Sequence, residues 1–128
     1  MAVWLTDAWF EAVVARGGQC PPAPGVSARV QVALIGGPDG DVDVQFVVDD
    51  GRVVAGGLGR VADPDVTGTV PFADAEALVR GDLDLPTAFM QGRVKLAGDM
   101  KVALEVLVWS STDAARALIT DVAAASEF

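Results

Sequence analysis

The chain has 128 residues, one cysteine and no histidine, and its 18 acidic and nine basic residues give a formal net charge of −9. This length fits one domain with its own core, and the lack of histidine excludes the usual zinc, haem and Ser–His–Asp sites. No cofactor is expected, nucleic acid would be repelled, and no apolar run is long enough for stable membrane insertion.

The N-terminal residues predict a helix followed by a stiff linker. The first ten residues lack a basic start and contain Asp7 before any sizeable apolar stretch, which favours a cytoplasmic protein over a secreted one. Thr6 can cap a helix over residues 7–16. Two glycines end this helix, and the proline-rich remainder of residues 17–25 leaves no room for regular structure.

Residues 26–70 predict strands. Apolar and polar residues alternate over residues 26–34 and again over 42–48, with a glycine-rich turn between them. Two further strands are expected over residues 52–59 and 65–70. The expected arrangement is a four-stranded antiparallel meander.

The second half of the chain predicts mainly helices. They are expected over residues 74–80, 86–91, 100–110 and 113–125, with a fifth strand at 93–97. The fold class is therefore α+β, a five-stranded mostly antiparallel sheet covered by about five helices, and residues 1–128 form one domain whose sheet and helices occupy residues 26–125.

The predicted helix over residues 100–110 is apolar on nearly every side, because only Lys101 and Glu105 interrupt it. Such a helix should be buried on nearly all sides. A ligand, a partner or the final helix could supply the cover, and the periodicity leaves all three open.

Residues 65–70, and above all residues 88–100 (Ala-Phe-Met-Gln-Gly-Arg-Val-Lys-Leu-Ala-Gly-Asp-Met), resemble the sterol carrier protein type 2 domain family. The family pattern there is an aromatic or Met pair, Gln-Gly, a short basic and apolar strand, and Gly-Asp or Gly-Asn before an apolar helix. Gly81 and Asp84 fit this pattern, and Trp9 fits the smaller stand-alone bacterial members. Peroxisomal members end in a targeting signal that the final Ser126-Glu127-Phe128 does not match.

The resemblance implies an apolar tunnel between the sheet and the helices, with the last helix as a flap. It further implies that the protein, without catalysis, binds and transfers a sterol, fatty acid or fatty acyl chain. Gln91 would offer a polar end near the ligand. The ligand-binding residues predicted on this basis are Phe72, Leu78, Phe89, Met90, Gln91, Met100, Leu104, Leu107, Val108, Trp109, Leu118, Ile119 and Val122.

Two other functions stay open. An accessory module that docks a lipid-metabolising enzyme would expose an apolar patch over a filled core. An enzyme acting on an apolar substrate in the cavity would use a buried carboxylate with a raised pKa, such as Asp99 or Asp84, although an aspartate before a helix is more often a cap.

Two sequence patterns that could indicate a nucleotide site and a calcium site have simpler explanations. Residues 57–62 match a nucleotide-binding Gly-x-Gly-x-x-Ala pattern, but Asp63-Pro64 follows where the phosphate-binding helix should run. The acidic residues at 39, 41 and 43 lack the spacing of a calcium loop and fit a solvated strand face.

Overall fold

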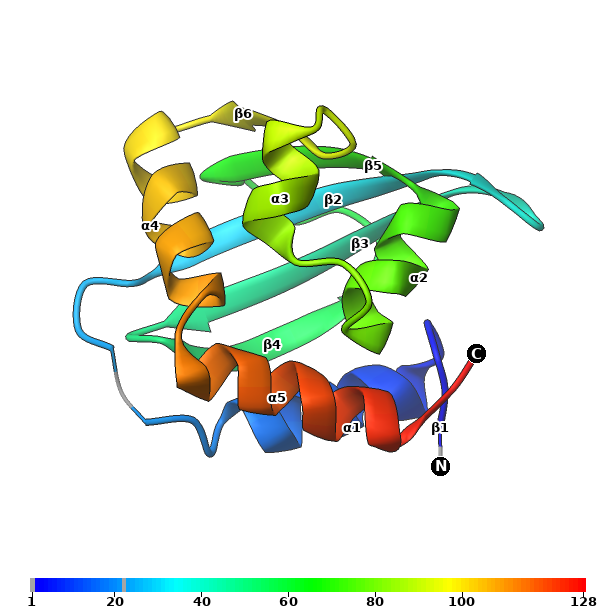
Figure 1. Cartoon of the computed structure of the whole chain (residues 1–128), viewed down its shortest axis with the longest axis horizontal. Coiled ribbons are helices and arrows are strands. Elements are labelled where there is room, and N and C mark those ends of the chain that lie inside the picture. The colour runs from blue at the N-terminus through cyan, green and yellow to red at the C-terminus, as the bar shows by residue number, and fades with distance from the viewer. Residues whose placement is uncertain (1, 22) are drawn as a thin grey trace.

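The computed structural model describes residues 2–21 and 23–128, and Figure 1 shows the arrangement of their helices and strands. The helices are α1 (Asp7–Gly17), α2 (Phe72–Arg80), α3 (Leu85–Met90), α4 (Met100–Ser110) and α5 (Asp113–Ala124). The strands are β1 (Ala2–Val3), β2 (Ala28–Gly37), β3 (Gly40–Asp49), β4 (Arg52–Leu58), β5 (Val66–Pro71), β6 (Lys95–Gly98) and β7 (Ser126–Glu127). Each of the five predicted helices is present, with ends within two residues of the predicted bounds.

The helices begin where the sequence places capping residues. Thr6 accepts a hydrogen bond from the Trp9 amide at the start of α1, and Thr112 caps α5 in the same way. Asp99 accepts from the first amides of α4, which confirms its expected structural role. Gly81 ends α2 with φ 83°, a left-handed conformation that glycine adopts without strain.

The main sheet has the strand order β4-β3-β2-β5-β6. The pairs β4–β3, β3–β2 and β5–β6 are antiparallel, whereas β2 and β5 are parallel. The predicted four-stranded meander is therefore wrong: the chain leaves β4 at one edge, crosses two strands and returns beside β2. The sheet is nevertheless mostly antiparallel, as predicted.

Hydrogen bonds between β2 and the segment before β5 hold this crossover in place. The Arg29 amide donates to the Asp65 carboxylate at 2.8 Å, and the Asp65 amide donates to the Arg29 carbonyl at 2.9 Å. The Gln31 side chain accepts from the Val61 amide at 2.7 Å and donates to the Gly59 carbonyl at 3.2 Å. These contacts place the start of β5 beside β2, and alternation along a single strand does not reveal them.

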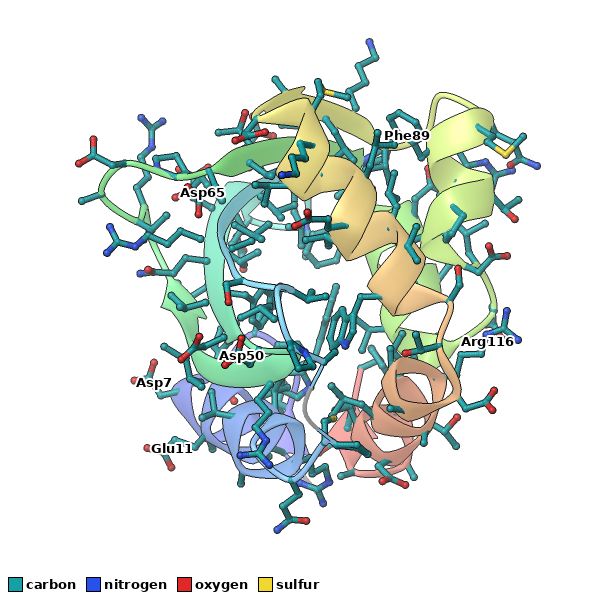
Figure 2. All side chains as sticks on the ribbon, turned by 90° about the vertical axis from the view of Figure 1, so that its left-hand side faces the viewer. Asp7, Glu11, Asp50, Asp65, Phe89 and Arg116 are labelled. Carbon is teal, nitrogen blue, oxygen red and sulfur yellow. The ribbon has the colours of Figure 1, made fainter. Side chains whose placement is uncertain are left out.

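All the helices cover one face of the main sheet or its β4 edge. In Figure 2 the sheet curves on the left, α3 and α4 lie on the right, and α1 and α5 run beneath. Val30, Val32 and Leu34 point to the helical side, in agreement with the predicted alternation of β2. Helix α1 packs on β4 so closely that a Cβ at Gly17 would lie 2.5 Å from the Cβ of Val53.

The two ends of the described chain meet in a second, two-stranded parallel sheet of β1 and β7. Beside it, the Trp9 indole donates to the Ser126 hydroxyl at 2.7 Å, and Ser126 is only 5% exposed. This small sheet was not predicted, because two-residue strands carry no periodic signal. It joins the C-terminal end of α5 to α1.

No helix in the described ranges is both long and apolar enough to span a bilayer.

Candidate functional site

An inner pocket of about 200 Å³ lies between the sheet and the helices. Its floor is formed by the inward-facing residues of β2, β3, β5 and β6, and its roof by residues of α2, α3 and α4. Every described wall residue is apolar or a glycine, which makes the pocket suited to hydrocarbon and unsuited to ions or water. The wall comprises Trp4, Leu5, Trp9, Val30, Val32, Leu34, Val44, Phe46, Val66, Gly68, Val70, Ala75, Leu78, Val79, Leu85, Val94, Leu96, Ala103 and Val106.

An outer pocket of about 620 Å³ lies between α5, the end of α4 and the α2–α3 connection. This volume is typical of small-molecule sites, which occupy roughly 300 to 1,000 Å³. Apolar side chains of the helices form most of its wall. The polar wall residues are Asp82, Asp84, Ser110, Ser111, Arg116 and Thr120.

The two pockets adjoin, because they share part of their walls. Val106 of α4 faces both, and so does Leu78 of α2. Together they give an arrangement that is fully apolar at its inner end and carries polar groups at its outer end. The residues common to both walls are Trp9, Phe46, Leu78, Val79, Leu85 and Val106.

Some of the residues predicted to bind ligand lie on these walls. Leu78 faces both pockets, whereas Trp109, Leu118, Ile119 and Val122 line the outer one. The last three come from α5, so the final helix forms a wall of the outer pocket.

The other predicted residues lie elsewhere. Met90 is 85% exposed and Gln91 is also exposed, and neither lines a pocket. Leu107 is buried but outside both walls. Phe89 is partly buried between α3 and α4 (Figure 2), and Phe72 packs against the Trp4 ring with centroids 5.1 Å apart.

Helix α4 exposes one apolar face. Met100, Leu104 and Val108 are 46%, 54% and 71% exposed, whereas Ala103 and Leu107 are buried. Within this chain the helix is therefore not buried on nearly all sides, and the final helix does not cover this face. Figure 1 shows the reason: α4 lies at the left-hand edge of the helices that cover the sheet, with α3 on one side of it.

Sequence reasoning missed Val106, Val79 and Leu85, which link the two pockets. Val106 follows the buried Ala103 by three residues, so the two side chains lie on the same, inward-facing side of the helix. The sequence does not indicate which side of α4 faces inward, because the helix is almost entirely apolar and no polar stripe marks its outer side.

The carboxylates do not resemble a buried acid or base. Hydrogen bonds from the Thr87 hydroxyl and amide lower the pKa of Asp84 below its ordinary value, with a smaller contribution from the charge of Arg116. Asp99 is exposed, caps α4 and lies outside both pockets. A cavity acid requires a raised pKa, which is opposite to the shift at Asp84.

Comparisons with solved structures identify the fold. A crystal structure of sterol carrier protein 2 superposes with a TM-score of 0.71 at 18% identity, over 94% of this chain and 97% of that chain. A solution structure of palmitated sterol carrier protein 2-like 2 from Aedes aegypti gives 0.65 at 25% identity, over 88% and 96%. The sec-alkylsulfatase Pisa1 from Pseudomonas sp. gives 0.56 at 25% identity, over 80% of this chain but 16% of that enzyme.

A comparison with curated proteins gives no match. The sequence profile of the SCP-2 sterol transfer family, in contrast, matches residues 18–107, which include the main sheet, α2, α3 and most of α4. The chain therefore belongs to the SCP-2 sterol transfer family.

Proposed function

We propose that the two adjoining pockets act as one tunnel that binds an apolar lipid, such as a sterol, a fatty acid or a fatty acyl chain, without catalysis. The observation that carries this proposal is the continuous apolar wall, in which Val106 and Leu78 face both pockets. The tail would enter the inner pocket and the head would remain in the outer one. Family membership and the palmitated Aedes aegypti relative support the same function.

The free energy gained by burying a lipid chain in the pockets is large enough to give measurable affinity for that lipid. Each methylene group removed from water contributes about 0.8 kcal/mol, so a sixteen-carbon chain gains about 13 kcal/mol. Association and ordering cost about 4 to 15 kcal/mol. The affinity therefore depends on how much of the chain is buried, which makes the junction between the pockets decisive.

Val106 and Val108 provide a matched test of this tunnel. Val106 faces both pockets, whereas Val108, two residues later on α4, is exposed and faces neither. The Val106→Phe variant should close the junction and exclude at least two methylene groups, which lowers affinity at least about tenfold. The Val108→Phe variant should bind as the wild type does.

Binding would be measured on delipidated protein by titrating a fatty acid or a sterol and following the fluorescence of Trp9 and Trp109, which line the outer pocket. Native mass spectrometry of the untreated protein would identify any lipid that co-purifies. Equal affinities of the two variants, or no binding by the wild type, would overturn the tunnel.

A second candidate function, docking to a lipid-metabolising enzyme, is favoured by the exposed face of α4 formed by Met100, Leu104 and Val108. The likeness to part of Pisa1 shows that the fold also occurs within an enzyme chain. In this case a Val108→Lys variant should lose the partner while lipid binding is unchanged. The expected cytoplasmic location also stays a prediction.

A further inference from the structure

Arg116 is the one cationic residue on the walls of the two pockets in the described part of the chain. It lies in the first half of α5 and is exposed, and Figure 2 shows its side chain at the outer surface of the molecule, on the side away from the sheet. Among residues 2–21 and 23–128, no hydrogen bond or ion pair engages its guanidinium group. An arginine on a mostly apolar wall without an internal partner is free to bind a ligand group.

The hydroxyl groups of the outer wall are already engaged. Ser110 and Ser111 donate to the Leu107 carbonyl at 2.6 and 3.4 Å, and Thr120 donates to the Arg116 carbonyl at 3.0 Å. Because each satisfies a helix carbonyl, none is oriented toward the pocket as a donor. The guanidinium group is thus the main donor available to a lipid head group.

The nearby carboxylates shape which head group fits. Asp84 accepts hydrogen bonds from the Thr87 amide and hydroxyl at 3.1 and 2.8 Å, and these bonds, more than the charge of Arg116, lower its pKa. The Asp84 carboxylate therefore caps α3 and forms no ion pair with Arg116. With Asp82 also on the wall, the repulsion by these carboxylates grows with the charge of the head group, so a doubly charged head group is opposed more strongly than a singly charged one.

Given lipid binding as proposed above, we infer that Arg116 binds the single carboxylate of a fatty acid at the rim of the outer pocket. The site would then prefer a fatty acid over a neutral lipid with the same chain, and also over a lipid phosphate. The apolar tail supplies most of the affinity, and Arg116 selects the head. Since the rim is open to solvent, the preference should be about fivefold and should weaken with salt.

The test compares dodecanoate, dodecan-1-ol and dodecyl phosphate on delipidated protein at about pH 8, where the carboxylic acid is ionised. The Arg116→Gln variant should bind dodecanoate about fivefold more weakly and dodecan-1-ol within twofold of wild type. Arg116→Lys should retain part of the preference, because it keeps the charge but loses the planar donor pair. The matched control is Arg60→Gln, which removes an exposed arginine that is paired with Asp43 and lines neither pocket.

The outcomes separate the two proposals. If wild type binds neither dodecanoate nor dodecan-1-ol, lipid binding itself fails. If it binds both and Arg116→Gln weakens both equally or neither, the assignment of Arg116 fails while lipid binding stands. Tighter binding of dodecyl phosphate than of dodecanoate would also overturn the preference for a single charge.

Discussion

At the residue scale, two glycines of neighbouring strands have opposite roles. Gly68 in β5 lines the inner pocket, and a Cβ there would meet Leu96 at 3.4 Å and Val32 at 3.7 Å, which are ordinary contacts. Gly98 at the end of β6 has φ 103°, and a Cβ there would lie 2.5 Å from the Asp65 carbonyl oxygen. Gly68 thus leaves room for a ligand, whereas Gly98 is required by the backbone.

We expect Gly68→Ala to raise the free energy of unfolding by about 0.5 to 1 kcal/mol, because alanine restricts the unfolded chain and its methyl group fits. Gly98→Ala should lower it by more than about 1 kcal/mol, because both the φ angle and the close approach to Asp65 oppose a side chain. Urea denaturation of the two variants would measure both changes. A larger loss at Gly68 than at Gly98 would contradict this description of the inner pocket.

The sequence could indicate the lining of the site only in part. On β2 the alternation of Val30 and Val32 with polar neighbours identifies the pocket face. On α4 an almost continuous apolar composition gives no such indication, so Leu104 and Val106 look equivalent although only Val106 lines a pocket. Packing against neighbouring elements decides which side of a helix faces inward. For a helix without a polar stripe, the sequence alone does not predict that side.

At the element scale, α4 has two apolar faces with different surroundings. Ala103 and Leu107 are buried against the rest of the fold, whereas Met100, Leu104 and Val108 form a row at four-residue spacing that is open to solvent. An exposed apolar row contributes little to stability within one molecule, because folding does not remove it from water. Met100, Leu104 and Val108 therefore contribute little to the stability of the chain itself.

Leu104→Lys should change the free energy of unfolding by no more than about 0.5 kcal/mol, as expected for a surface position. Leu107→Lys should cost at least about 3 kcal/mol, because it places a charge at a buried position. Thermal or urea denaturation of these two variants of the same helix would show the contrast. A severe loss for Leu104→Lys would mean that this face is covered within the folded chain.

The elements that the sequence predicted well have a local signal at one end at least. α4, for example, starts at the cap Asp99, and α2 stops at Gly81, which follows it. The partner of β5 is different, because it depends on the contacts of Asp65 and Gln31 across the sheet. The crossover to a parallel pair could not be deduced from alternation, which identifies a strand but not its neighbour.

At the scale of the whole molecule, the outer pocket brings together segments from both ends of the chain. Trp9 of α1 and Val122 of α5 belong to the same wall. The hydrogen bond from Trp9 to Ser126 spans 117 positions and joins the end of α5 to α1. A ligand in this pocket would contact α1, α2, α4 and α5 at once, so ligand binding should stabilise the entire fold and not one element alone.

Delipidated protein should therefore melt at a lower temperature than protein saturated with a fatty acid. A ligand at one hundred times its Kd adds about 2.7 kcal/mol to the free energy of unfolding, which corresponds to a rise in Tm of roughly 10 °C for a domain of this size. The Val106→Phe variant, with its junction closed and its affinity lowered at least about tenfold, should show about half that rise or less at the same ligand concentration. Scanning calorimetry with and without ligand would measure both values, and hydrogen exchange should slow in α5 as well as in α1. An equal rise in the wild type and the variant would place the ligand outside the junction, since the stabilisation would then not depend on access to the inner pocket.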